Sequence, residues 1–106
     1  MKLIVMVKIH GDWCGPNWTQ GRNVPANTPG IDFKAPCQDK LDCGCRAHDQ
    51  DCAKTGGCSK AGDRKLVAIA LKEALNPINI LLRPEYADKA AFVAAGIQVQ
   101  IPFRKR

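Results

Sequence analysis

The chain has 106 residues, a formal net charge of +6 from 16 basic and 10 acidic residues, and six cysteines. This length accommodates one domain, here residues 1–106, and excludes two. The surplus of Lys and Arg favours an anionic partner, either a nucleic acid or an anionic lipid surface. No segment of the sequence is apolar over the length that a transmembrane helix requires.

Six cysteines in so small a chain favour three disulfides, because a small domain has little core and disulfides are its usual reinforcement. Disulfides persist in oxidising surroundings, so this interpretation predicts a secreted or virion-associated protein. The competing interpretation is a reduced protein whose thiolates bind zinc.

The opening residues 1–9, MKLIVMVKI, contain an apolar run that is too short for the core of a signal peptide, and no cleavage-site pattern follows. We expect a strand or a short packed segment here. The sequence would then be a domain of a longer protein, or a protein that leaves the cell by another route.

Residues 11–38 are rich in Gly, Pro and Asn and show no helical period, which predicts a long loop. The presence of Trp13, Cys14 and Trp18 within it indicates that the loop is ordered. A helix is expected over residues 39–54, where the sequence TGG ends it.

A second helix is predicted over residues 60–75, and Asn76-Pro77 closes it. Its apolar stripe at helical spacing consists of Leu66, Val67, Ala70, Leu71 and Ala74.

The segment INILL is compatible with a short helical turn, and a third helix is predicted over residues 84–95, with Pro84 in its first turn and Gly96 at its end. The alternation in IQVQI predicts a strand over residues 97–101. The basic tail FRKR is expected to be mobile.

The stretch LDCGCRAHDQDC at residues 41–52 combines cysteines, a histidine and several aspartates. On a helix, Cys45 and Asp49 share a face and His48 lies beside it. If Cys45 were bonded to Cys14, the loop WCGPN would face the Asp49 carboxylate. Backbone carbonyls and a carboxylate together form a site suited to calcium.

The loop WCGPN followed by this helix resembles the calcium loop and active-site helix of the secreted phospholipase A2 superfamily, and is similar to the phospholipase domains of parvovirus and densovirus capsid proteins. The resemblance covers about half the chain, residues 13–66. It implies a mainly α, disulfide-stapled fold with a calcium loop over 11–38 and two antiparallel helices, completed here by the expected short extra helix and C-terminal strand.

The resemblance also implies the chemistry, which is hydrolysis of the sn-2 ester of glycerophospholipids by an activated water. His48 would be the general base, and calcium would be held by Asp49 and by the carbonyls of Trp13, Gly15 and Asn17. The Gly15 N–H would help to hold the oxyanion. A Cys14–Cys45 disulfide is implied as well.

The implied partner is a phospholipid bilayer or micelle surface, which the basic charge suggests is anionic, and no nucleic acid is expected. The sequence does not specify an oligomeric state.

Three departures from the family pattern stand out. Gly44 replaces the first member of an adjacent cysteine pair, Asn17 replaces a loop glycine, and Cys52 replaces a tyrosine whose hydroxyl supports the catalytic aspartate in the family. The pairing of the other four cysteines remains open, with Cys37–Cys43 and Cys52–Cys58 as short-loop candidates.

The family also requires an aspartate on the second helix to orient the histidine. Asp63 is the first candidate because it falls on the apolar stripe of that helix, and Asp88 is the alternative. Two other functions remain open: a phospholipase-like module that binds lipid without catalysis, and a basic zinc-binding module for nucleic acid. A standard zinc finger does not have the spacing found among Cys43, Cys45, His48 and Cys52.

Overall fold

The computed structural model of the protein describes residues 8–106. The strand or packed segment expected over residues 1–9 therefore lies mostly outside the described residues. Ile9, the last residue of that segment, is half-buried and packs against the hydrophobic core.

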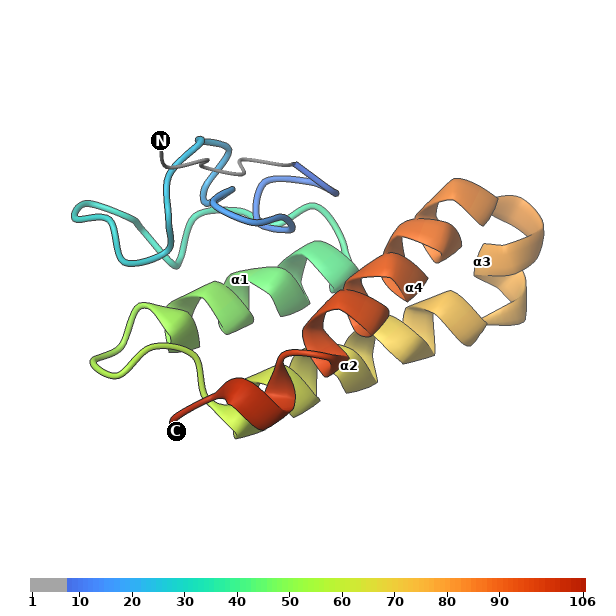
Figure 1. Ribbon diagram of the computed structural model, residues 1–106. Coiled ribbons are helices and arrows are strands. Elements are labelled where there is room, and N and C mark those ends of the chain that lie inside the picture. The colour runs from blue at the N-terminus through green and yellow to red at the C-terminus, as the bar shows by residue number, and fades with distance from the viewer. Residues whose placement is uncertain (1–7) are drawn as a thin grey trace, which may run out of the picture.

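The described chain is mainly helical. Its helices are α1 (Lys40–Cys52), α2 (Lys60–Leu75), α3 (Pro77–Leu82) and α4 (Pro84–Gln98), followed by a 3₁₀ turn, η1 (Ile101–Phe103). Figure 1 shows α1 and α2 side by side and running in opposite directions, with α4 packed on α2 and the loop before α1 lying over α1. None of the helices in residues 8–106 has the length and apolar character needed to cross a bilayer.

The helices α1 and α2 begin where short polar side chains satisfy their first N–H groups. The Asp39 carboxylate accepts from the N–H of Asp42, and the Ser59 hydroxyl accepts from the N–H of Gly62. α3 and α4 each begin with a proline, whose missing N–H would have no helical partner there. The predicted second helix is confirmed at both ends.

The core lies where α1, α2 and α4 meet the loop, and the fully buried Trp13 closes it on the loop side. Gly44 is buried in the contact between α1 and α2, where a Cβ would lie 3.1 Å from the Ile69 side chain. A glycine at this point lets the two helices approach closely. The buried apolar residues of the three helices include Leu41, Leu66, Ala70, Ala90, Val93 and Ala94.

Asp42 ties the long loop to α1. Its fully buried carboxylate accepts from the backbone N–H groups of Asp12, Trp13 and Gln38, at 2.9 to 3.2 Å. These bonds satisfy the buried charge and the N–H groups of the loop at once, so they fix the loop conformation. The role of Asp42 is therefore structural.

Three disulfides staple the fold, and the described residues contain no free cysteine. Cys14–Cys45 joins the loop to α1 across 31 residues. Cys37–Cys43 and Cys52–Cys58 close short loops at the start and the end of α1. The pairing implied by the resemblance and the two short-loop candidates are therefore all present.

The strand predicted over residues 97–101 is wrong, as is the end of the third helix at Gly96. α4 continues to Gln98, and a turn then leads into η1. A strand needs a neighbouring backbone to pair with, and the pairing in residues 8–106 is confined to isolated bridges within the loop. Alternation over five residues also fits the last turn of a helix followed by a turn.

The basic tail, expected to be mobile, instead docks on the start of α2. The Lys60 N–H donates to the Arg106 carbonyl and the Lys60 ammonium to the Arg104 carbonyl, each at 3.0 Å. The Arg106 side chain bonds the Gly57 carbonyl and lies 3.6 Å from the Asp51 carboxylate. The tail thus belongs to the fold.

Candidate active site

A cavity of about 410 Å³ opens between the loop, α1 and α4. Polar groups of the loop and of α1 line one side of it, and α4 supplies the other. Its apolar wall includes Ile9, Leu66, Phe92, Val93 and Ile97. A mostly apolar cavity with a few polar groups is the usual form of a site for a small or amphipathic ligand.

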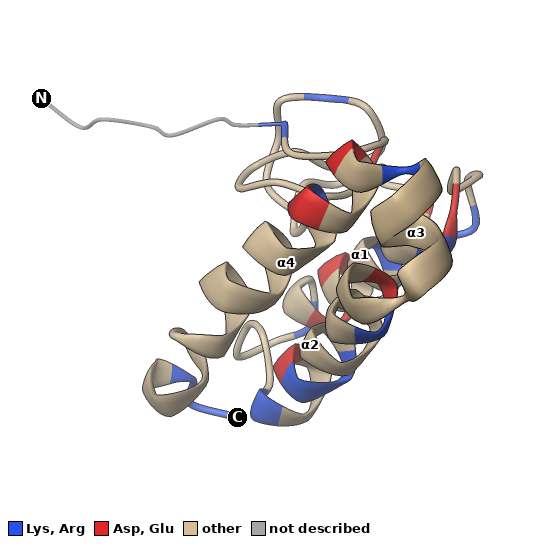
Figure 2. Cartoon of the chain, turned by 90° about the vertical axis from the view of Figure 1, so that its right-hand side faces the viewer, with Lys and Arg blue, Asp and Glu red and all other residues tan. Residues whose placement is uncertain are grey.

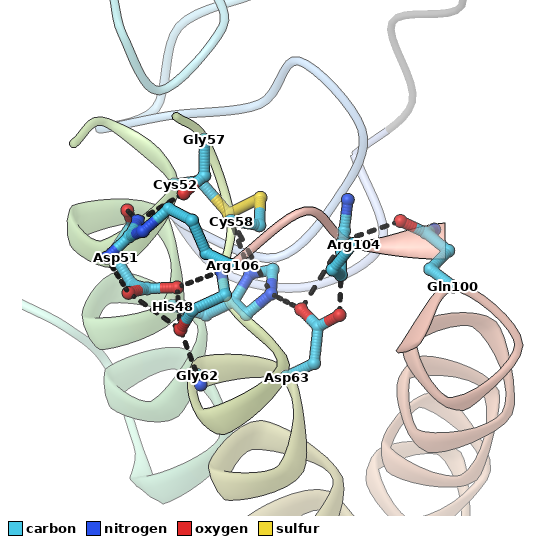
Figure 3. Close-up of a disulfide and its surroundings, with 11 residues drawn as sticks. His48, Asp51, Cys52, Gly57, Cys58, Gly62, Asp63, Gln100, Arg104 and Arg106 are labelled. Carbon is cyan, nitrogen blue, oxygen red and sulfur yellow. Dashed lines mark hydrogen bonds and ion pairs between the residues drawn. A yellow bond between two sulfur atoms is a disulfide. The ribbon is translucent and has the colours of Figure 1, made fainter. Parts of the chain in front are cut away.

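His48 projects from α1 towards Asp63 on α2, and the two make a short hydrogen bond of 2.6 Å between Nε2 and Oδ1 (Figure 3). The Asp63 side chain is fully buried, and the His48 side chain is only 9% exposed. Since a carboxylate accepts, Nε2 carries the proton, which leaves Nδ1 as the basic ring nitrogen. Asp63 is thus the aspartate beside His48, whereas Asp88 is exposed on α4.

Asp49 follows His48 on α1 and also lines the cavity. Its Oδ2 atom is buried without a hydrogen-bond partner. Burial, together with the negative charge of Asp42, raises the pKa of Asp49 from 3.8 to about 8. An orphaned buried carboxylate oxygen beside another negative charge is a setting that a bound cation would stabilise.

Three loop residues line the same cavity: Trp13, Gly15 and Asn17. Gly15 and Asn17 have positive φ values of 144° and 53°, conformations that Gly adopts freely and Asn tolerates. The Cys14–Cys45 disulfide holds this loop against the helix that carries Asp49. The structure therefore brings together the loop residues and the α1 residues singled out from the sequence.

The Cys52 sulfur lies 3.7 Å from His48 Nδ1, and His48, Cys52 and Cys58 form a compact cluster of ligand-type atoms. Both sulfurs belong to one disulfide, so neither is available as a zinc thiolate. The remaining four cysteines are disulfide-bonded as well. This pairing removes the thiolate ligands on which the zinc interpretation depended.

Arg104 was not expected from the sequence, yet it lines the cavity and contacts the carboxylate of Asp63 (Figure 3). No local motif marks Arg104, because it meets Asp63 from 41 residues away.

The burial of Glu73 was not expected either. Its carboxylate accepts a hydrogen bond of 2.8 Å from the Tyr86 hydroxyl, whereas Leu71 of the predicted stripe is 41% exposed.

Comparisons of the chain with protein-family models, with curated proteins and with solved structures found no match.

Proposed function

We propose that the protein is a calcium-dependent phospholipase A2 that hydrolyses the sn-2 ester of glycerophospholipids. One observation carries the proposal: His48, backed by Asp63, and the orphaned carboxylate of Asp49 share an apolar cavity with the Trp13–Asn17 loop. The His–Asp pair can activate water, the carboxylate can hold a cation, and the apolar wall can take an acyl chain.

His48 is the general base in this proposal. The Asp63 carboxylate accepts a hydrogen bond from the Nε2–H group, so Nδ1 is the atom that takes a proton from water. Asp63 also fixes the ring orientation and balances the imidazolium that forms when the proton is transferred. No nucleophilic side chain is required, because water is the nucleophile.

The Asp49 carboxylate is suited to the role of a calcium ligand. Its buried Oδ2 has no partner, and the loop lining the same cavity can offer the carbonyls of Trp13, Gly15 and Asn17, the hard oxygen donors that calcium prefers. Bound calcium would polarise the ester carbonyl and attract the substrate phosphate. The Gly15 N–H is the proposed donor to the developing oxyanion.

The surroundings of the cavity suit a lipid surface. Phe92, Val99 and Phe103 are 66%, 67% and 83% exposed, and the basic tail follows the last of them directly. Figure 2 shows Lys and Arg gathered along α2 and at the C-terminus, whereas α4 is uncharged beyond its first turns. Exposed apolar side chains beside cations favour the surface of an anionic bilayer or micelle.

The three disulfides are compatible with oxidising surroundings, and we propose that the protein acts in secreted or virion-associated form. The proposed function is tested by fatty-acid release from phosphatidylglycerol vesicles with calcium and with a chelator. Release only with calcium supports it. Vesicle binding without release would favour the lipid-binding module, and neither binding nor release would reject both.

A further inference from the structure

Arg104 holds the Asp63 carboxylate from the side away from His48. Its Nε donates to Oδ2 at 2.7 Å, and its terminal Nη2 lies 3.3 Å from Oδ1, the oxygen that also accepts from His48. Figure 3 shows the carboxylate between the imidazole and the guanidinium. His48, Asp63 and Arg104 therefore form one continuous chain of hydrogen bonds.

The charges in this chain give Arg104 a specific task. Asp63 is fully buried, and a buried carboxylate is costly unless a positive charge or several donors balance it. A neutral His48, the form that can accept a proton, supplies a donor and no charge. Among the described residues, Arg104 then supplies the positive charge that balances the Asp63 carboxylate.

Arg104 is itself held in place by further contacts. Its Nη2 donates to the Gln100 side chain at 2.7 Å, and its carbonyl accepts from the Lys60 ammonium at 3.0 Å. Lys60 begins α2, the helix that carries Asp63 one turn later. The tail and the carboxylate are thus anchored to the same helical turn, which limits the freedom of the guanidinium.

We propose that Arg104 is a positioning residue for the reaction: it fixes the Asp63 carboxylate, and Asp63 in turn holds His48 with Nδ1 ready to accept a proton. This inference rests on the proposed function. Two N–H donors in a rigid fork orient a carboxylate, which a single point charge does not. Misplacing a catalytic group by about 1 Å costs on the order of 10²-fold in rate.

The test compares Arg104→Gln with Lys105→Gln, which removes the same charge from the adjacent exposed position. Rates are measured on phosphatidylglycerol vesicles at a temperature where thermal unfolding shows each variant to be folded. We expect the kcat of Arg104→Gln to be about tenfold to 10²-fold below that of Lys105→Gln, with the same KM for vesicles in the two variants and an unchanged calcium Kd. Lys105→Gln is the reference for the loss of one charge from the basic tail, which is proposed to face the lipid surface.

Chemical rescue and a conservative variant separate positioning from fold stability. Added guanidinium ion should restore part of the kcat of Arg104→Ala and leave the parent unchanged. Arg104→Lys should give an intermediate kcat, because it keeps the charge and loses the two-donor fork. If Arg104→Gln and Arg104→Ala do not fold, Arg104→Lys decides: a reduced kcat supports the inference, and a parent-like kcat overturns it.

The two proposals can fail separately. If the parent is active and Arg104→Gln matches Lys105→Gln in kcat, the inference is wrong and the proposed function stands. If the parent is inactive, the proposed function is wrong, and the NMR resonance of the His48 Nε2 proton tests the positioning instead. A resonance lost or moved in Arg104→Gln, and unmoved in Lys105→Gln, supports it; an unmoved one contradicts it.

Discussion

Residues 8–106 contain two His–Asp pairs of the same length, and the two pairs differ in what surrounds them. His10 Nε2 and Asp39 Oδ2 are 2.6 Å apart, as are His48 Nε2 and Asp63 Oδ1. Asp39 also caps α1, so the first pair joins the loop to the start of that helix. The second pair lies at an apolar cavity, next to the orphaned carboxylate of Asp49.

This difference shows that a His–Asp hydrogen bond does not by itself define a site. Asp39 satisfies a helix N-terminus, and His10 packs edge-on against Tyr86 at 5.4 Å between ring centroids. These contacts give the first pair a structural role. At the second pair, the buried Oδ2 of Asp49 lacks a partner and the adjoining cavity has room for one. The region around the second pair, where a buried carboxylate oxygen lacks a partner, is therefore the candidate functional site.

The largest expected effect comes from changing both histidines in the same manner. We expect His48→Gln to reduce turnover by about 10² to 10⁴-fold, because glutamine keeps a hydrogen bond and cannot act as a base at neutral pH. His10→Gln should leave turnover unchanged and lower the free energy of unfolding by about 1 kcal/mol, because glutamine loses the ring contact with Tyr86. Initial rates and urea unfolding measure the two effects.

Equal activity losses in the two variants, or no loss in His48→Gln, would remove the functional distinction between the pairs.

A second change addresses the carboxylates of the two pairs. Asp63→Asn should keep the fold and lower turnover by less than His48→Gln does, about 10²-fold, because the ring is misoriented while the base remains. Asp39→Asn should have little effect on turnover, since asparagine is also a good helix N-cap. The same vesicle assay measures both, and a silent Asp63→Asn would show that His48 works without its partner.

The cavity that distinguishes the second pair can be tested at Gly96, which lines it and where a Cβ would meet no atom within 4 Å. Gly96→Leu should intrude on the space proposed for the acyl chain and raise KM by about tenfold, equivalent to about 1.4 kcal/mol of binding. Gly96→Ala is the matched control and should raise stability by up to about 1 kcal/mol, since Gly is a poor helix former. An unchanged KM in Gly96→Leu would place the acyl chain elsewhere.

The buried carboxylate of Asp49 also predicts the pH dependence of stability without calcium. The folded-state pKa of Asp49 is raised to about 8, so the folded protein keeps a proton that the unfolded chain releases near pH 4. Stability from this group should therefore fall as the pH rises from about 4 to about 8. Asp49→Asn should flatten this decline in thermal unfolding midpoints, and calcium should oppose it in the parent. A variant profile that declines like the parent's would contradict the assignment of the buried charge.

Asp51 provides a control of opposite sign on the same helix. Burial raises its pKa, but hydrogen bonds from Ser59 and the charges of Arg106 and Lys54 outweigh burial and leave the pKa lowered. Its contribution to stability should be present above the unfolded-state value and lost as the pH falls through the folded-state value. Asp51→Asn should therefore change the acid side of the stability profile and leave the decline between about pH 4 and 8 in place.

The sequence predicted the parts of the site that lie close together along the chain. His48 and Asp49 were singled out by helical spacing and by the family resemblance. Asp63 was preferred to Asp88 because it falls on the inward stripe of the second helix. Arg104 could not be predicted, because its contact with Asp63 depends on how η1 turns the tail back onto α2. The prediction of a strand over residues 97–101 was wrong for a related reason. The partners with which a strand pairs are a property of the whole fold and not of local alternation.

The most direct measurement of the central claim is fatty-acid release from phosphatidylglycerol vesicles by the parent and by Asp49→Asn, each titrated with calcium. With a single carboxylate in the proposed site, half-maximal release by the parent should require about 10⁻⁴ to 10⁻³ M calcium. Asp49→Asn should fold, as judged by circular dichroism, and release no fatty acid at any calcium concentration tested. Calcium-dependent release by Asp49→Asn at the parent's rate would contradict the account.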